Sequence, residues 1–130
     1  MGPMTSSRPG LRAEEDSRTL AMRDVVDGLR EVLGARLVAY LSGLSSTAEL
    51  SQWTAGMAEP PAEVSRRLRC AFYVTGLLKE REGDVTIQSW FQGMNPLLED
   101  EAPAMLLREA EIGDAIHMVT LAARHFAAEG

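Results

Sequence analysis

Apolar residues recur at steps of three and four along most of the chain, which is the spacing of helices that bury one face. One stripe covers residues 22–34 and a shorter one residues 37–44. A third short helix is expected between a serine cap at position 45 or 46 and Gly56, because serine is a favoured N-cap and glycine a favoured helix end. The pattern of the first half of the chain therefore predicts three helices.

The second half continues this pattern. The longest predicted helix spans about residues 61–81, starting after a proline pair that suits a first helical turn. A short helix should run from Asp84 to the break at Asn95-Pro96, with Met94 facing inward, and another should follow Pro103. The last helix is expected over residues 112–130. Strand-like alternation and internal repeats are lacking, so the sequence predicts an all-α fold, a compact bundle of about six or seven helices.

Three segments differ in composition. Residues 1–18 are rich in Ser, Gly, Pro and mixed charge and lack an apolar period, which predicts a flexible N-terminal arm. Residues 19–83 carry the first helices and the long helix, and over residues 1–83 basic and acidic groups balance. Residues 84–130 contain eight acidic residues against Arg108 and Arg124. This acidic part should repel a phosphate backbone and suits a basic protein partner.

Composition excludes several classes of function. A chain of 130 residues, 45% of them hydrophobic, supports one ordinary core. One cysteine and two histidines provide neither a disulfide framework nor a zinc site. No apolar run reaches the roughly 20 residues of a membrane span, and no phosphate-binding loop or nucleophile motif occurs. We therefore expect a cytoplasmic binding protein that is not an enzyme, with no cofactor, no metal and no membrane contact.

Residues 35–56 have the features of a helix-turn-helix. Ala39 and Gly43 are the small residues that let two short helices cross steeply. Trp53 should be buried and should anchor the second helix against Leu68 and Phe72 of the long helix. The opposite side of the second helix would then face outward, as a recognition helix does in a DNA-binding protein.

Whether this motif binds DNA is open from the sequence. Glu49 stands at the start of the second helix, where a carboxylate meets phosphate unfavourably, and no Lys or Arg falls between Val38 and Val64. Phosphate contacts would come from arginines in flanking segments, including the N-terminal arm. Helix-turn-helix geometry also occurs in all-α proteins that do not bind DNA. The candidate DNA-contacting residues are Thr47, Ser51, Gln52, Arg36, Arg66 and Arg67.

The segment 90–107 combines large apolar residues with helix-breaking turns. Asn95-Pro96 predicts a rigid turn and Pro103 the start of a helix. Such a segment fits a packing corner of the core, and it also fits a loop presented to a partner. The carboxylate run of residues 99–101 has the same two interpretations, a solvated loop or charge offered to basic residues of a partner.

On these two segments the chain resembles the Xre/MbcA/ParS antitoxins, whose toxin-binding domain pairs with RES-domain toxins. The family pattern is a helix-turn-helix, a long helix, a Trp, an Asn-Pro turn, a Leu, a Pro shortly before Leu-Leu, and a closing helix. Glu99 and Asp100 depart from it, since family members often carry small glycines there. The matching residues are Gly43, Trp53, Gly56, Pro60, Trp90, Asn95, Pro96, Leu98, Pro103, Leu106 and Leu107.

The resemblance implies an antitoxin that binds and neutralises an NAD-degrading RES-domain toxin and represses its own operon through operator DNA, as a homodimer or a hetero-oligomer with the toxin. A toxin that binds a dinucleotide needs cationic groups, which an acidic segment would complement. The alternative is a stand-alone helix-turn-helix regulator or interaction module without a toxin. The candidate partner-binding residues are Trp90, Asn95, Pro96, Leu98, Glu99, Asp100, Glu101, Pro103, Leu107, Glu129 and Gly130.

Overall fold

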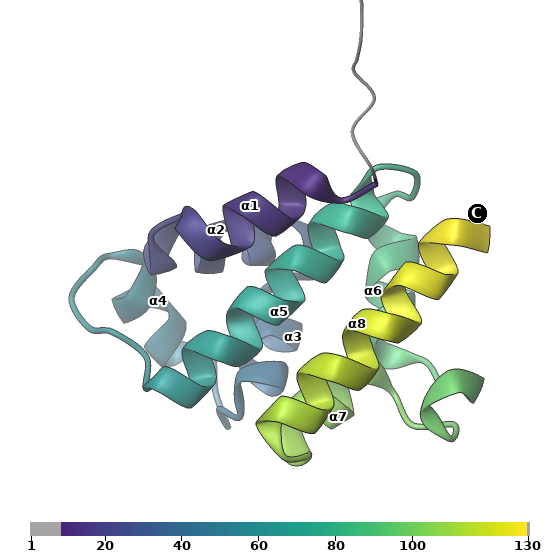
Figure 1. Ribbon diagram of the computed structural model, residues 1–130. Helices are drawn as coiled ribbons and strands as arrows, with labels where there is room; N and C mark the ends of the chain where they lie inside the picture. Colours follow the sequence, from purple (N-terminus) through teal and green to yellow (C-terminus); the bar gives the residue numbers. More distant parts are fainter. Residues whose placement is uncertain (1–8, 130) are drawn as a thin grey trace, which may run out of the picture.

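The computed structural model describes residues 9–129, which fold into eight α-helices and one short 3₁₀ helix, with no strand in that range (Figure 1). The predicted all-α class is confirmed, with one helix more than expected. The elements are α1 (Leu11–Thr19), α2 (Met22–Leu33), α3 (Ala35–Ser42), α4 (Ala48–Thr54), α5 (Ala62–Lys79), α6 (Asp84–Gln92), the 3₁₀ helix η1 (Pro96–Leu98), α7 (Pro103–Glu109) and α8 (Ile112–Glu129).

Helix α5 is the centre of the bundle. Helices α1, α2, α3, α6 and α8 all pack against it, and in Figure 1 it crosses the molecule with α1 and α2 on one side and α8 on the other. Its buried residues lie around most of its circumference, as expected for a helix covered by neighbours on several sides. Thr120 of α8 lies beside Cys70 and Arg124 beside Tyr73, so α8 runs parallel to α5.

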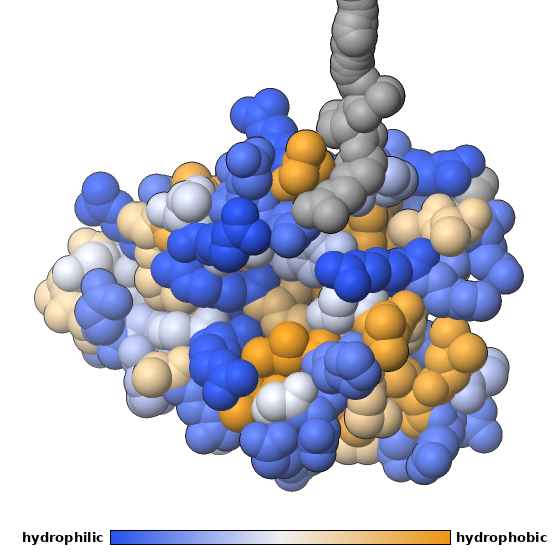
Figure 2. Space-filling view, viewed as in Figure 1, coloured by the Kyte–Doolittle hydropathy of each residue, from blue (hydrophilic) through white to orange (hydrophobic). Residues whose placement is uncertain are grey.

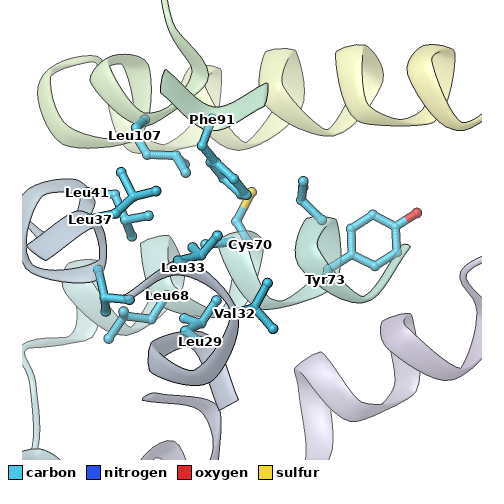
Figure 3. Close-up of a cluster of buried hydrophobic side chains, with 14 of the residues drawn as sticks. Leu29, Val32, Leu33, Leu37, Leu41, Leu68, Cys70, Tyr73, Phe91 and Leu107 are labelled. Atoms are coloured by element: carbon cyan, nitrogen blue, oxygen red, sulfur yellow. The ribbon is translucent and has the colours of Figure 1, made fainter. Parts of the chain in front are cut away.

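The core is continuous across the helices (Figure 3). Its largest fully buried side chain is Phe91 of α6. Packing of this kind stabilises a domain of this size chiefly by removing apolar surface from water, at roughly 25 cal/mol per Å². The labelled members of the cluster are Leu29, Val32, Leu33, Leu37, Leu41, Leu68, Cys70, Tyr73, Phe91 and Leu107.

Helix α1 corrects the expectation of a flexible arm over residues 1–18. Residues 1–8 lie outside the described part, but residues 11–19 form a helix that packs along α5. Its buried residues are only Ala13 and Ser17. Two small residues make no apolar stripe, which is why the periodicity of the sequence did not reveal this helix.

Polar contacts fix both ends of α1. The amide of Gly10, which has φ +79°, donates to the carboxylate of Glu80 just beyond α5 (3.0 Å). At the other end the guanidinium of Arg69 donates to the carbonyl oxygens of Ser17 (2.9 Å) and Leu20 (3.0 Å). These acceptors belong to the last turn of α1 and its cap, where carbonyls lack partners within the helix.

The segment predicted as a helix-turn-helix comprises α3, residues 43–47 and α4. Gly43 ends α3 with φ +88°, a conformation that glycine adopts without strain. Trp53 is buried as predicted, at 4% exposure. Its helix packs chiefly against α2, not against α5 as expected, because the ring of Phe72 on α5 faces Gly28 of α2 instead.

In the range 9–129, none of the helices combines the length and apolar character needed to cross a membrane.

Candidate functional site

The connection between α6 and α7 is a compact loop closed by its own hydrogen bonds. The amide of Asn95 donates to the carbonyl of Glu101 (3.2 Å), and the amide of Asp100 donates to the carbonyl of Asn95 (2.9 Å). The Asn95 side chain accepts from the amide of Leu97 (3.0 Å) and so caps η1. Buried Leu98 and the packing of η1 on α8 attach the loop to the bundle. The loop is therefore held in one conformation.

Two consecutive residues of this loop have a strained backbone. Glu99 has φ +57° and Asp100 φ +67°, values that residues with a Cβ rarely adopt. Each such position costs on the order of 1–3 kcal/mol and persists only where the surroundings impose it. Backbone strain of this kind is concentrated at functional sites, so the loop is a candidate functional segment.

The surface of the loop is both apolar and acidic. Met94 is 80% exposed and Leu97 55% exposed, next to the exposed carboxylates of residues 99–101. We call Met94, Leu97 and the carboxylates of residues 99–101 the acidic patch. The expectation that Met94 faces inward is wrong, because α6 ends at Gln92 and Met94 lies beyond it.

Three of the predicted partner-binding residues are core residues. Leu98, Pro103 and Leu107 are buried, so their side chains pack inside the protein and offer no surface to a partner. This corrects their assignment as contacts. Large apolar residues beside turns fit both roles in a sequence, and here packing between α7, α8 and the rest of the bundle uses them.

The other predicted partner-binding residues lie nearer the surface. Trp90 is half-buried, edge-on to Phe91 with ring centres 5.3 Å apart. Asn95 is half-buried and Pro96 exposed, both within the loop. Glu129 is exposed at the end of α8, with its carboxylate 3.2 Å from Nε2 of His125. Gly130 lies outside the described residues.

The predicted DNA-contacting residues do not form one surface. Thr47, Ser51 and Gln52 are exposed on α4 and at its start, as expected. Arg36 and Thr47 line a cavity of about 590 Å³ together with Ser45, Ser46, Tyr40 and Arg108. The structure thus brings Thr47 and Arg36 together at one cavity. The sequence named both residues as candidates for contacting DNA but did not predict that they share a site.

Arg66 and Arg67 serve different parts of the molecule, which corrects their joint assignment. Successive residues of a helix are turned by about 100° from each other, so two neighbouring arginines face different sides. Arg67 donates to the carbonyl of Ser42 at the end of α3 (3.4 Å) and to the carboxylate of Glu63 (3.0 Å), and its side chain is only 14% exposed. Arg66 instead lines a groove between α5 and α8.

Arg108, which no motif of the sequence marks as a binding residue, holds the end of α3. It donates to the carbonyl oxygens of Tyr40 (2.8 Å) and Leu44 (3.1 Å), and its guanidinium lies 4.8 Å from the centre of the Tyr40 ring. Together with Arg67, which donates to Ser42, it binds carbonyl oxygens at the C-terminus of α3 and just after it. Both arginines therefore have structural roles next to α4.

The only cysteine of the sequence, Cys70, is buried on α5. Burial raises the pKa of the Cys70 thiol to about 11, while its contact with the hydroxyl of Thr120 (3.8 Å) acts in the opposite direction. A thiol in this state is protonated at neutral pH and unreactive. Over the described residues, no group of three or more His, Cys, Asp or Glu side chains is placed to hold a metal ion.

Comparisons with known protein families, with curated proteins and with solved structures find no match to this chain.

Proposed function

We propose that this protein is an antitoxin-like binding module that neutralises a RES-type toxin through the acidic patch. The observation that carries the proposal is the 94–101 loop, which presents two apolar side chains and three carboxylates on a backbone held in one strained conformation. The resemblance of the sequence to Xre/MbcA/ParS antitoxins supplies the class of partner.

The make-up of the patch supports protein binding. Met94 and Leu97 supply apolar area that becomes favourable when a partner covers it. The carboxylates complement a cationic surface, such as one that holds the phosphates of a dinucleotide. A loop already closed by hydrogen bonds loses little conformational entropy on binding, which favours affinity.

The strained residues agree with the resemblance. Glu99 and Asp100 occupy positions where the resembled family often has glycines, and both have the positive φ that glycine favours. The loop therefore keeps a backbone suited to the family pattern while replacing glycines by carboxylates. We infer that the partner of this chain has a more basic surface than the partner of a family member whose loop contains glycines.

The test is co-expression with a RES-domain toxin encoded beside this chain, with cell growth as the readout. Removing the charges with Glu99→Gln, Asp100→Asn and Glu101→Gln should reduce rescue of growth, and Met94→Ser with Leu97→Ser should do the same. The matched control is the triple variant Glu31→Gln, Glu49→Gln and Glu59→Gln, which changes the net charge equally at exposed positions of the first half. Full rescue by both patch variants would contradict the proposal.

A second candidate function is DNA-binding regulation without a toxin. The observation that favours it is the cavity where Arg36 and Thr47 meet the hydroxyls of Ser45 and Ser46, groups that suit a phosphate. The carboxylates Glu49 and Glu59 on and after α4 are exposed and oppose it. A shift assay on the DNA upstream of the coding sequence separates the two functions.

A further inference from the structure

An apolar groove runs along α5 between α1 and α8. Its lower part is a cavity of about 330 Å³ whose floor includes Cys70, Tyr73 and Ile116. A second cavity of about 340 Å³ continues it towards Leu77, and Glu14, Tyr73 and Arg124 line both. Figure 2 shows apolar side chains in the hollow between α5 and α8, bordered by hydrophilic ones. Cavities of this size are typical of small-ligand sites, roughly 300–1,000 Å³.

The rim of this groove is cationic, although the protein as a whole carries a net charge of −6. Four arginines line the lower cavity against one carboxylate, that of Glu14. They come from three helices, so only the folded bundle brings them together. The residues are Arg18 of α1, Arg66 and Arg69 of α5, and Arg124 of α8.

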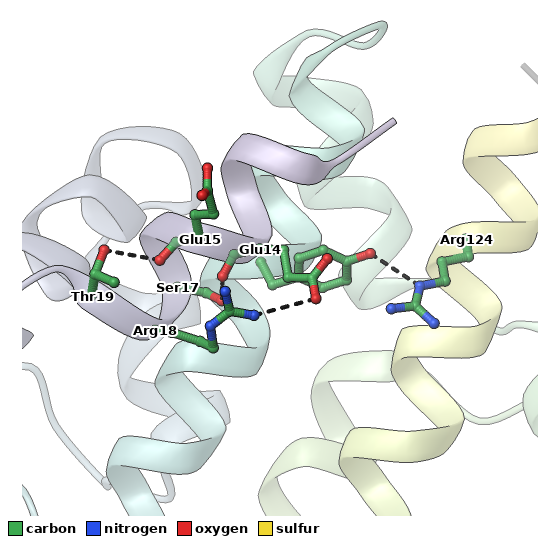
Figure 4. Close-up of polar contacts among 7 residues, drawn as sticks. Glu14, Glu15, Ser17, Arg18, Thr19 and Arg124 are labelled. Atoms are coloured by element: carbon green, nitrogen blue, oxygen red, sulfur yellow. Dashed lines mark hydrogen bonds and ion pairs between the residues drawn. The ribbon is translucent and has the colours of Figure 1, made fainter. Parts of the chain in front are cut away.

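The arginines are held in place but retain donors. Nε of Arg124 donates to the hydroxyl of Tyr73 (3.0 Å), and Arg18 pairs with the carboxylate of Glu14 (3.3 Å), as Figure 4 shows. Arg69 is engaged by the end of α1. A guanidinium has five N–H donors, so these contacts leave donors for an incoming anion. The hydrogen bond to the Tyr73 hydroxyl, and to a smaller extent the nearby carboxylate of Glu14, raise the pKa of Arg124.

We propose that this groove binds a small amphipathic anion, an alkyl or aromatic body with one carboxylate or phosphate head group. The head group takes its hydrogen bonds from the rim arginines Arg66 and Arg124, because Arg18 already pairs with Glu14. The apolar body lies over the half-buried Ile116 on the floor. Arginine recognises carboxylates and phosphates through paired N–H donors, which gives the site its preference for these head groups.

The apolar floor distinguishes this site from a nucleic-acid surface. A phosphate backbone needs a row of exposed cations and gains little from covering the half-buried Ile116 on the floor of the groove. An amphiphile removes the floor from water and places its charge at the rim. The site is also separate from the acidic patch, because α8 contacts α5 on one side and η1 on the other.

The experiment is isothermal titration calorimetry of the full chain with sodium dodecanoate below its micelle concentration. We expect saturable binding of one molecule per chain, comparable binding of dodecyl phosphate, and at least about tenfold weaker binding of dodecanol and dodecylammonium, since a charge-assisted hydrogen bond contributes roughly 1.5–3 kcal/mol. Arg66→Ala and Arg124→Ala should each weaken dodecanoate binding by about tenfold or more.

The matched control is Arg12→Ala, which removes an arginine of α1 whose side chain is 92% exposed and does not line the groove. It should leave dodecanoate binding unchanged, and melting curves should show that all three variants remain folded. Equal affinity for dodecanoate and dodecylammonium would overturn the proposal, as would unchanged binding by the Arg66 variant. Sedimentation with phosphatidylglycerol vesicles, without binding of free dodecanoate, would also overturn it and indicate a membrane-surface contact instead.

Discussion

Gly76 on α5 and Ala13 on α1 approach so closely that a Cβ atom added to Gly76 would lie 2.7 Å from the Cβ of Ala13. Real Cβ atoms do not come this near to each other, and neither side chain is flexible enough to move aside. The docking of α1, and with it one wall of the arginine-lined groove, therefore depends on the absence of a side chain at position 76.

The first prediction is that Gly76→Ala destabilises the protein. Alanine in a helix interior usually gains about 1 kcal/mol over glycine, but here the clash with Ala13 should outweigh that gain and leave a net loss of about 1–2 kcal/mol. Urea denaturation measures the change. Gly113→Ala in α8 is the control, since its new methyl would meet only the Glu111 side chain, and it should be neutral or stabilising. A more stable Gly76→Ala protein would contradict the close packing of α1.

The second prediction concerns the strained loop. Asp100→Gly should raise the free energy of unfolding by up to about 1 kcal/mol, because glycine adopts φ +67° without the steric cost that a Cβ atom imposes, and the larger backbone entropy that glycine loses on folding offsets part of this gain. Glu99→Gly should act in the same direction. Glu101→Gly is the control, because Glu101 does not have a positive φ, and it should be neutral or destabilising. A gain in stability that accompanies a loss of toxin neutralisation would show that the strained carboxylates serve binding and not folding.

The third prediction follows from the buried thiol. Cys70 should react very slowly with iodoacetamide at pH 8 in the native protein and rapidly in urea, because its pKa is raised to about 11 by burial. An acid whose pKa is higher in the folded state contributes stability that is present below its unfolded pKa, near 9, and is lost as the pH rises towards 11. Cys70→Ala should remove this part of the alkaline loss of stability. Rapid native labelling at pH 8 would contradict the burial.

The sequence predicted the helices whose large apolar residues repeat at helical spacing. It did not predict a helix that buries only small residues. The stripe over residues 22–34 corresponds to α2, and the long predicted helix over 61–81 corresponds closely to α5. Helix α1 was missed because it buries only Ala13 and Ser17, which no periodicity of large residues can reveal. The start of α6 at Asp84 was predicted, but its end at Gln92 was not. Because α6 ends before Met94, this residue is exposed and does not lie in the core as predicted.

The candidate site was predictable as a segment but not residue by residue. The sequence singled out residues 90–107, yet it did not separate Leu98 and Leu107, which pack inside, from Leu97, which is exposed, because residue type alone does not show which leucines face the core. The positive φ of Glu99 and Asp100 arises from the hydrogen bonds of the closed loop and has no signal in the residue types. The arginine-lined groove is contributed by α1, α5 and α8 together, so no local pattern could indicate it.

The last prediction separates arginines that are free to contact DNA from those that hold α3. If α4 and the neighbouring cavity bind DNA, Arg36→Ala should weaken binding to all sequences and reduce its salt dependence, because Arg36 is exposed beside Thr47. Arg67→Ala should leave the salt dependence unchanged but lower stability by about 1–3 kcal/mol, since it removes the donor to Ser42 and the partner of Glu63. Shift assays across a salt series and urea denaturation measure the two effects. An Arg67→Ala protein of parental stability but reduced DNA affinity would mean that Arg67 faces the DNA, and that the contacts with Ser42 and Glu63 are not what fixes its position.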